Sequence, residues 1–246
     1  MTSTMTQTMT SARTSTVTAL MQVSDLSYRY PRSGSLLDSI DFSLYAGDRV
    51  ALMGANGAGK TTFLHLLVGL KKAKAGNVMA FGRNRIAEAD FVEVRAKAGF
   101  LFQDPDDQLF CPTVLEDVAF GPLNMGKSRE QALAISRETL ASLGMVGFEA
   151  RVAHQLSGGE KRMVTLASVL AMEPEVLLLD EPSNALDTDA RKRLIEILQS
   201  LPQAMIIISH DDDFLTQLAT RRVCLENGKL SELDAVVSSE LDVGIA

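Results

Sequence analysis

Residues 54–61 read Gly54-Ala55-Asn56-Gly57-Ala58-Gly59-Lys60-Thr61, a glycine-rich run that ends in a lysine and a threonine. It fits the pattern G-x-x-x-x-G-K-[ST], in which the backbone N–H groups of a glycine-rich loop surround phosphate oxygens. In such a loop the lysine reaches the β- and γ-phosphates, and the threonine hydroxyl meets Mg²⁺. Taken alone, the pattern predicts a site for a nucleoside triphosphate.

The residues on either side of the loop supply the context that the motif needs. Arg49 to Met53 is typical of a short buried strand, and Thr62 to Val68 is typical of a helix. A helix that begins at the loop directs its positive end toward the phosphates. We therefore interpret the loop as a phosphate site rather than as a chance glycine-rich turn.

A second element suited to phosphate lies far downstream and reads Leu156-Ser157-Gly158-Gly159-Glu160. Ser157 and Glu160 have the spacing of a capping box, which predicts that a helix begins there with its N–H groups and positive end exposed. One chain therefore has two helix N-termini that suit phosphate binding, which limits the classes of protein to which it can belong.

Two apolar runs deliver ionisable side chains to the sheet edge where α/β proteins bind ligands. Val176 to Leu179 leads into Asp180 and Glu181, and Ala204 to Ile208 leads into Ser209 and then His210. Asp180 suits Mg²⁺, directly or through water, and Glu181 suits the water that attacks the γ-phosphate. His210 is placed to hydrogen-bond that phosphate or water, although a lone histidine is more often structural.

Composition argues against several other functions. The net charge of -7 and the pI of about 5.1 give no basic footprint, so we expect no nucleic-acid partner. Cys111 and Cys224 lack C-x-x-C spacing, and we assign them no redox or zinc role. The run Asp211 to Asp213 is expected to begin a helix rather than to bind a metal. No run of about eighteen apolar residues occurs, so we expect no membrane span.

The chain is predicted to form one domain over residues 21–235, with a disordered tail at 1–20, rich in Thr, Ser and Met, and a short C-terminal tail at 236–246. Short alternating segments over residues 21–45 predict an antiparallel hairpin layer ahead of the phosphate loop. Either Tyr28 or Tyr30 in this layer could stack on a nucleotide base.

A helical insertion is predicted over about residues 104–160. Prolines punctuate this segment, and helical patterns cover Val114 to Ala119 and Arg129 to Leu143. The prolines are Pro105, Pro112 and Pro122.

In their order, these elements resemble the ATP-binding cassette family, the nucleotide-hydrolysing subunits of ABC transporters, from about Val23 to Leu230. The matching motifs are a Walker A loop at Gly54 to Thr61, a Q-loop glutamine at Gln103, the family signature at Leu156 to Glu160, Walker B at Val176 to Asp180 followed by Glu181, a D-loop at Ser183 to Asp187 and a switch histidine at His210.

The resemblance implies an α/β fold of the P-loop NTPase type, with a mixed, mainly parallel sheet and helices, an antiparallel β layer and a helical subdomain. It implies ATP and Mg²⁺ as cofactors. It gives catalytic roles to Glu181, His210 and Gln103, and contacts with Mg²⁺ to Thr61, Gln103 and Asp180. The residues implied in ATP binding are Tyr30, Gly54, Asn56, Gly57, Ala58, Gly59, Lys60, Thr61, Thr62, Ser157, Gly158 and Gly159.

The resemblance also implies a head-to-tail dimer. ATP bound at Lys60 and Thr61 of one subunit would be covered by Ser157, Gly158 and Gly159 of the other, either in a homodimer with two competent sites or in a heterodimer with a sister ATPase. The residues 183–187 and Ser209 are small departures from the threonine or glycine that is more usual in the family.

Residues 100–110 and 113–122 resemble, within the family, the ATPase subunits of energy-coupling-factor importers, particularly those for cobalt and nickel. In those importers this region docks a helix of the membrane partner, and Gln103 joins the ATP site to that contact. The resemblance therefore implies an ATPase peripheral to the cytoplasmic face of the cell membrane, which energises uptake of Co²⁺ or Ni²⁺ through transmembrane partners. Import of a vitamin or another micronutrient is the near alternative, because such an ATPase does not touch the cargo.

The sequence argues against three functions outside transport. A soluble clamp ATPase of DNA repair or chromosome organisation needs a long coiled coil between Walker A and the signature, and residues 61–157 lack a sustained heptad pattern. A ribosome-associated translation factor resembles two cassettes in one chain, whereas this chain has one Walker A motif. A module that binds nucleotide without turnover would lack Glu181 or His210, and both are present.

Overall fold

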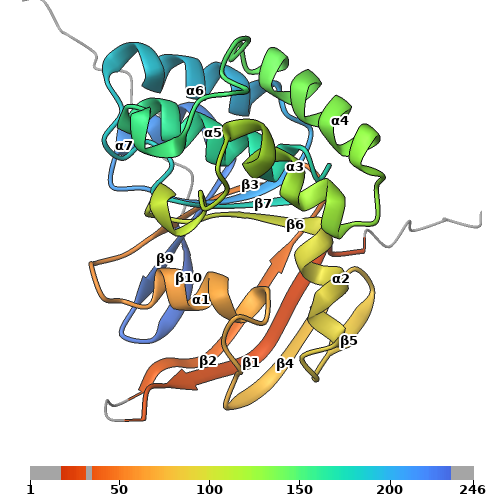
Figure 1. Ribbon diagram of the computed structural model, residues 1–246. Helices are drawn as coiled ribbons and strands as arrows, with labels where there is room; N and C mark the ends of the chain where they lie inside the picture. The colour runs from red at the N-terminus through yellow and green to blue at the C-terminus, as the bar shows by residue number, and fades with distance from the viewer. Residues whose placement is uncertain (1–17, 32–34, 234–246) are drawn as a thin grey trace, which may run out of the picture.

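The computed structural model describes residues 18–31 and 35–233, and two β-sheets organise this part of the chain (Figure 1). The first sheet is antiparallel in the order β2-β1-β4-β5, formed by β1 Met21–Arg29, β2 Ser35–Leu44, β4 Ala75–Ala80 and β5 Arg83–Arg85. The second has the order β10-β9-β3-β8-β7-β6, formed by β3 Arg49–Met53, β6 Ala98–Leu101, β7 Val176–Asp180, β8 Ala204–Ile208, β9 Arg221–Glu226 and β10 Lys229–Leu233. All neighbours in the second sheet are parallel except β10 and β9.

The helices in the described residues are α1 Lys60–Leu67, α2 Asp90–Lys97, α3 Val114–Asn124, α4 Arg129–Ser142, α5 Gly158–Leu170, α6 Thr188–Ser200 and α7 Asp212–Leu218. Single 3₁₀ turns lie at Pro105–Asp107 and Ala153–Gln155. None of the helices within residues 18–31 and 35–233 has the length and apolar character needed to cross a membrane.

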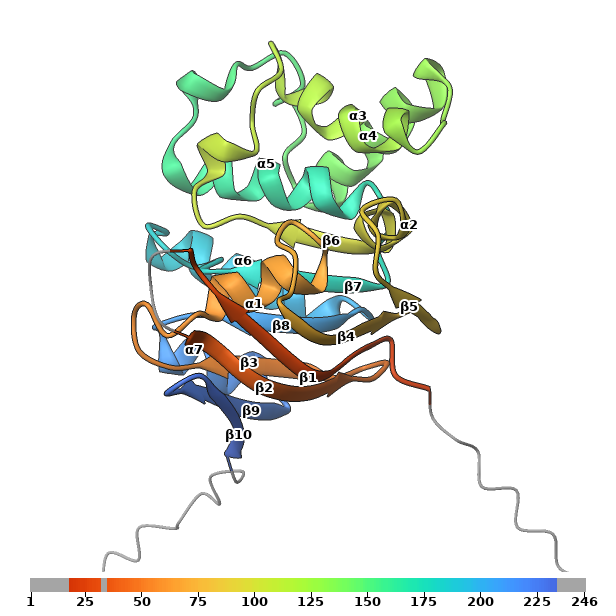
Figure 2. The ribbon, with the colours of Figure 1, turned by 90° about the horizontal axis from the view of Figure 1, so that it is seen from below.

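Two hydrophobic cores lie on opposite faces of the second sheet. Every residue of β7 and β8 is buried, and alternate residues of a strand point to opposite faces. Val176 and Leu178 join the core that includes α1 and the antiparallel sheet, whereas Leu177 and Leu179 join the core beneath α3 to α7. Helix α1 therefore lies between the two sheets, and the helical layer of α3, α4 and α5 covers the other side (Figure 2).

Several predicted elements are confirmed. The strands expected at 49–53 and 204–208 have those bounds, and the strand expected at 176–179 includes Asp180 as well. Residues 21–29 and 35–44 form the antiparallel strand pair β1 and β2. The run of aspartates begins a helix, because Asp211 caps α7 by accepting a hydrogen bond from the Phe214 N–H.

Three predicted boundaries were wrong. Helix α3 does not end at Ala119 but continues to Asn124 with Pro122 inside it. Proline removes one hydrogen bond from the helix, but the buried ring of Pro122 packs in its last turns. Helix α1 begins at Lys60 rather than at Thr62. Leu20, assigned to the tail, donates to the Leu44 carbonyl at 2.8 Å and accepts from Phe81 at 2.8 Å. The rest of the predicted N-terminal tail up to residue 17, and the C-terminal tail, lie outside the described residues.

Candidate active site

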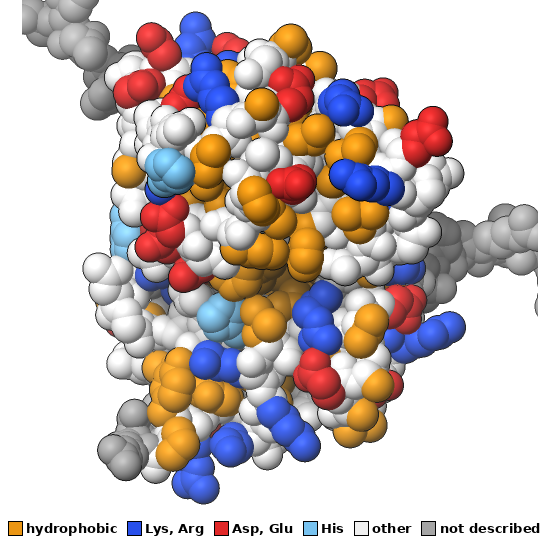
Figure 3. Space-filling view, in the orientation of Figure 1, with side chains coloured by type: hydrophobic (Ala, Val, Ile, Leu, Met, Phe, Trp, Pro, Cys, Tyr) orange, Lys and Arg blue, Asp and Glu red, His pale blue; other side chains and the backbone are white. Residues whose placement is uncertain are grey.

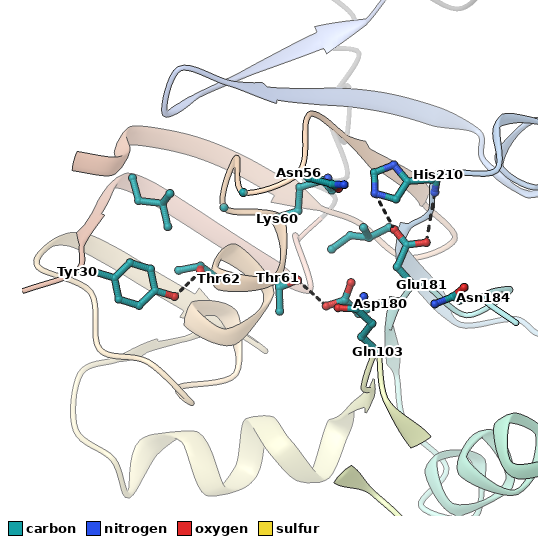
Figure 4. Close-up of a pocket in the computed structure, with 14 residues that line it drawn as sticks. Tyr30, Asn56, Lys60, Thr61, Thr62, Gln103, Asp180, Glu181, Asn184 and His210 are labelled. Carbon is teal, nitrogen blue, oxygen red and sulfur yellow. Dashed lines mark hydrogen bonds and ion pairs between the residues drawn. The ribbon is translucent and has the colours of Figure 1, made fainter. Parts of the chain in front are cut away.

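A cavity of about 570 Å³ lies where the phosphate loop meets the carboxyl ends of β7 and β8 (Figure 4). The strands β3, β8 and β7 are parallel neighbours, so the residues that follow them gather at one edge of the sheet. The lining residues are Tyr30, Leu36, Asn56, Gly57, Gly59, Lys60, Thr61, Thr62, Gln103, Asp180, Glu181, Asn184, Ile208 and His210.

The glycines of the loop are required by its backbone shape. Gly59 is the N-cap of α1 with φ of 109°, and its carbonyl accepts the Phe63 N–H at 2.8 Å. Gly54 has φ of 139°, and a Cβ at this position would lie 2.4 Å from the carbonyl oxygen of Leu225. Only glycine lets the loop pass this close to β9 and then turn into α1. The positive end of α1 consequently faces the cavity, which suits phosphate.

Lys60 and Thr61 occupy the first turn of α1. The ammonium of Lys60 donates to the carbonyl oxygens of Gly54 at 2.6 Å and Ala55 at 3.1 Å, which holds it across the loop. The Thr61 hydroxyl donates to Oδ2 of Asp180 at 2.7 Å. This hydroxyl, the Asp180 carboxylate and the amide of Gln103 line one cavity, and they are the oxygen donors that Mg²⁺ prefers. The residues present therefore fit a Mg²⁺ ion bound with the phosphates of a nucleotide.

Asp180 is the last residue of β7, and Glu181 follows it. Asp180 is buried and Glu181 is partly buried. Burial raises the pKa of Asp180, and the hydrogen bond from Thr61 and the nearby charge of Lys60 act in the opposite direction. Burial also raises the pKa of Glu181, opposed mainly by His210. Glu181 has a φ of 50°, a left-handed conformation that a side chain seldom adopts. The chain therefore leaves the extended strand conformation at Glu181, directly after Asp180.

His210 follows β8 and faces Glu181. Its backbone N–H donates to Oε2 of Glu181 at 3.3 Å, and its Nε2 lies 3.4 Å from Oε1 (Figure 4). A carboxylate and an imidazole in contact at a cavity wall can orient and deprotonate a water molecule. The structure thus brings together the two side chains that the sequence placed on separate strands.

A network of hydrogen bonds involves the residues on either side of His210. The hydroxyls of Ser183 and Ser209 are 3.3 Å apart, and the Ser209 hydroxyl accepts the Asp211 N–H at 3.1 Å. Arg191 of α6 donates to both carboxylate oxygens of Asp211, at 2.6 and 3.0 Å. The two serines that depart from the usual family residues are therefore bonded to each other. No group of three His, Cys, Asp or Glu side chains able to hold a metal occurs in the part of the chain that the structure describes.

Tyr30 lies at the outer end of the cavity, whereas Tyr28 packs against the core. The Tyr30 hydroxyl is 3.0 Å from the Thr62 hydroxyl, and its ring meets that of Tyr28 edge to face with 5.1 Å between centroids. The ammonium of Lys71 lies 5.3 Å from the centroid of the Tyr30 ring. These contacts fix the ring beside the phosphate loop, where it could stack on a base.

The signature residues do not line this cavity. Ser157 caps α5 in the predicted capping box: its hydroxyl accepts from the Glu160 N–H at 3.2 Å, and Oε2 of Glu160 accepts from the Ser157 N–H at 2.8 Å. Ser157 and Gly158 are exposed, and Gly158 lines a neighbouring cavity of about 650 Å³ that also reaches Gln103. Within one chain, the helix start at Ser157 therefore does not line the cavity around Lys60, although the neighbouring cavity of Gly158 also reaches Thr61 and Asp180.

Some lining residues were not among the predicted site residues. Asn184 lies in the segment 183–187 that the sequence did single out, whereas the apolar Leu36 carries no local signal of function. Among the predicted residues, Gly54 and Ala58 lie in the phosphate loop but do not line the cavity.

Comparisons with known proteins agree with this geometry. The family model described as ABC transporter matches residues 37–184. The chain is 56% identical over 196 residues to a protein of Brucella suis biovar 1 that is provisionally named an ABC transporter ATP-binding protein, covering 80% of this chain and 82% of that protein. It is 44% identical over 216 residues to the energy-coupling factor transporter ATP-binding protein EcfA of Methanothermobacter thermautotrophicus, covering 86% and 69%.

Among solved structures, cbiO1 of Clostridium perfringens, part of the ABC transporter complex cbiONQ, superposes with a TM-score of 0.76 at 30% identity and covers 87% of each chain. With the phosphate loop, the acids of β7 and the histidine after β8 around one cavity, the chain belongs to the ABC transporter family as an ATPase that binds ATP with Mg²⁺.

Proposed function

We propose that this protein is the ATPase subunit of an energy-coupling-factor importer, held at the cytoplasmic face of the membrane by transmembrane partners. The observation that carries the proposal is an exposed aromatic pair, formed by the segment that follows Gln103 and by α3. Phe110 and Phe120 are 63% and 45% exposed, and their rings meet edge to face with 4.8 Å between centroids. The similarity to EcfA and to cbiO1 supports the same assignment.

Hydrogen bonds fix the loop of Phe110 against the helix that carries Phe120. Asp117 in α3 accepts the N–H groups of Phe110 at 3.0 Å and Cys111 at 2.8 Å, which fixes the loop against the helix. Leu123 and Met125 at the end of α3 are also exposed. Hydrophobic side chains gather on this face over α3 and in the hollow below it (Figure 3). An apolar surface of this kind suits a helix of a partner protein.

The exposed signature supports a dimer. Ser157 and Gly158 present a helix N-terminus that no phosphate loop of the same chain covers. A second ATPase subunit, identical or a sister, would bring its signature over Lys60 and Thr61 and complete the site. Two identical subunits would form two equivalent sites.

The side chains divide the work of hydrolysis. The loop N–H groups and Lys60 bind the phosphates, and Tyr30 stacks on the base. Thr61, Asp180 and Gln103 would hold Mg²⁺, which supplies positive charge to the phosphates when bound. Glu181 orients the attacking water and accepts its proton, and His210 hydrogen-bonds the γ-phosphate. ATP binding closes the dimer, hydrolysis reopens it, and Gln103 passes the motion to the aromatic surface.

The cargo that we propose is Co²⁺ or Ni²⁺, on the likeness of residues 100–122 to the ATPase subunits of cobalt and nickel importers. A vitamin or another micronutrient is the alternative, since the cargo would cross in the partner subunits. The motifs and contacts of this chain support the ATPase role, and they do not distinguish a metal ion from a vitamin or another micronutrient as the cargo.

The test is affinity purification of the tagged chain from gently solubilised native membranes, followed by identification of the co-purifying proteins and by ATPase and uptake assays. We expect integral membrane proteins and uptake of nickel or cobalt after reconstitution. The double variant Phe110→Ser/Phe120→Ser should lose the membrane proteins while keeping ATP binding. Lys60→Ala is the matched control, which should keep the partners and lose uptake. Recovery of ribosomes, DNA-maintenance proteins or no membrane protein would refute the proposal.

A further inference from the structure

Arg162, in α5, forms hydrogen bonds with the main chain at Phe102 and Gln103. Its Nη1 donates to the carbonyl oxygen of Phe102 and its Nη2 to that of Gln103, each at 2.6 Å. The side chain is almost fully enclosed, with Arg162 2% exposed. Two consecutive carbonyls of one loop are therefore held by one guanidinium whose planar fork matches them.

Stability alone does not account for this arginine. Burying a guanidinium is costly, and neutral carbonyls offset that cost less well than a carboxylate would. Its Nε is buried and has no hydrogen-bond partner among the described residues. The acids Asp104, Asp180 and Glu181 act on it only through their charge. An apolar side chain of similar volume would avoid burying a charge but would leave the carbonyls of residues 102 and 103 without these donors, so the role of the arginine is to fix the geometry of those two residues.

The loop that Arg162 holds contacts both α1 and α5. On one side, the rings of Phe100 and Phe102 lie beside His65 of α1, with centroids 5.4 and 6.5 Å from the imidazole. On the other side, Arg162 follows the first turn of α5, the helix that Ser157 caps. The Gln103 side chain itself lines the cavity with Thr61 and Asp180. The contact thus ties the signature helix to a residue of the ATP site in the same chain.

We propose that Arg162 is a positioning residue for ATP hydrolysis, which fixes the backbone of Gln103 to the signature helix so that the Gln103 side chain is held at the ATP site of its own chain. The inference rests on the role proposed above for Gln103. Arg162 does not touch the reacting atoms. Its loss should leave nucleotide binding at the phosphate loop intact and slow the chemical step, because Gln103 would no longer be held in place.

The experiment compares full-length wild type with Arg162→Met, Arg162→Lys, Gln103→Ala and the double variant. Single-turnover hydrolysis of γ-labelled ATP, with protein in excess, gives the rate of the chemical step, and calorimetry gives the Kd for ATP with Mg²⁺. We expect Arg162→Met to slow hydrolysis about 10- to 100-fold, the size of effect that a misplaced catalytic group produces, with Kd changed less than about twofold.

The double variant is the decisive comparison. If Arg162 acts through Gln103, Arg162→Met/Gln103→Ala should be no slower than Gln103→Ala alone. Arg162→Lys, which keeps the charge but loses the fork, should recover part of the rate and remains informative if the methionine variant does not fold. Lys161→Met is the matched control, because Lys161 neighbours Arg162 but pairs with Asp106 in an exposed contact at 2.6 Å.

Three outcomes would overturn the proposal: effects that multiply in the double variant, a loss of ATP affinity that matches the loss of rate, or a Gln103→Ala variant as fast as wild type. The assay follows ATP on the chain alone, so none of these outcomes bears on the membrane partners or the cargo.

Discussion

Glu181 meets His210 through both of its carboxylate oxygens, one bonded to the histidine backbone at 3.3 Å and the other 3.4 Å from its Nε2. The two residues follow β7 and β8, which pair in register up to Asp180 and Ile208. The backbone bond orients the carboxylate, so the position of the acid is set by the sheet and does not depend on the imidazole. The histidine side chain can then change partners without displacing Glu181.

Replacing Glu181 by glutamine should abolish turnover while ATP binding persists. The amide keeps the shape of the side chain but cannot accept a proton from water, and loss of a general base costs about 100- to 10,000-fold in rate. Hydrolysis and ATP affinity, measured on the same preparation, check this expectation. A Glu181→Gln variant that retains the wild-type rate would exclude Glu181 as the base.

The pH dependence of hydrolysis should reflect the buried carboxyl. Burial raises the pKa of Glu181 above its usual 4.5. The base is active only when ionised, so the rate should fall on the acid side at a pH above 4.5. An acid limb centred at or below that value would contradict the environment described for Glu181. The profile is measured under single-turnover conditions, where product release does not contribute.

The same shift predicts how stability responds to pH. A carboxyl whose pKa is raised by folding destabilises the folded state when ionised, and this penalty disappears as the pH falls below the unfolded value of 4.5. Glu181→Gln should therefore raise the Tm at pH 7, and its advantage over wild type should shrink toward pH 4. Thermal unfolding without nucleotide over this range measures the difference. If the Tm advantage of Glu181→Gln over wild type grew as the pH fell, the result would contradict a raised pKa for Glu181.

Lys60→Ala should weaken ATP binding itself. A charge-assisted hydrogen bond contributes about 1.5 to 3 kcal/mol, which corresponds to a rise in Kd of about 10- to 100-fold. Calorimetric titration with MgATP tests the effect. The Tm without nucleotide should change little, because Lys60 is bonded only to carbonyls of its own loop.

Gly54→Ala should destabilise the fold more than Gly126→Ala. Both glycines have positive φ, but a Cβ at Gly54 would lie 2.4 Å from the Leu225 carbonyl oxygen, whereas nothing lies within 4 Å at Gly126. The conformation of Gly126, with φ of 86°, costs an alanine about 1 kcal/mol, whereas Gly54 combines a less favourable φ of 139° with the close contact to β9, so its loss should be larger. Denaturant unfolding of both variants gives the comparison, and equal losses would show that the loop can retreat from β9.

Local patterns were sufficient where local forces decide the structure. The apolar runs of β7 and β8 had to be buried strands, and Ser157 with Glu160 specified the start of α5. The positions of Asp180, Glu181 and His210 followed because parallel strands end at one edge, whereas the site role of Gln103 was indicated only by the family resemblance. Proline usually ends or kinks a helix, but the buried Pro122 lies inside α3, which continues to Asn124.

The contacts that the sequence did not reveal join residues far apart in the chain. Arg191 reaches Asp211 across 20 positions, and Arg162 reaches Phe102 across 60. Nothing in the neighbourhood of either arginine indicates its partner, because the pairing depends on how α5, α6 and α7 pack on the sheet. The hydroxyl pair of Ser183 and Ser209 is of the same kind.

Strand β7 is buried in both cores, whereas Gln103 follows β6 at the edge of the sheet and Ser157 is exposed. In native-state hydrogen exchange, the amides of β7 should therefore exchange only through global unfolding, and those around Gln103 and Ser157 through local opening. Asp180 and Glu181 would then belong to the slowest part of the molecule, with the residues that respond to nucleotide moving around them on a faster timescale.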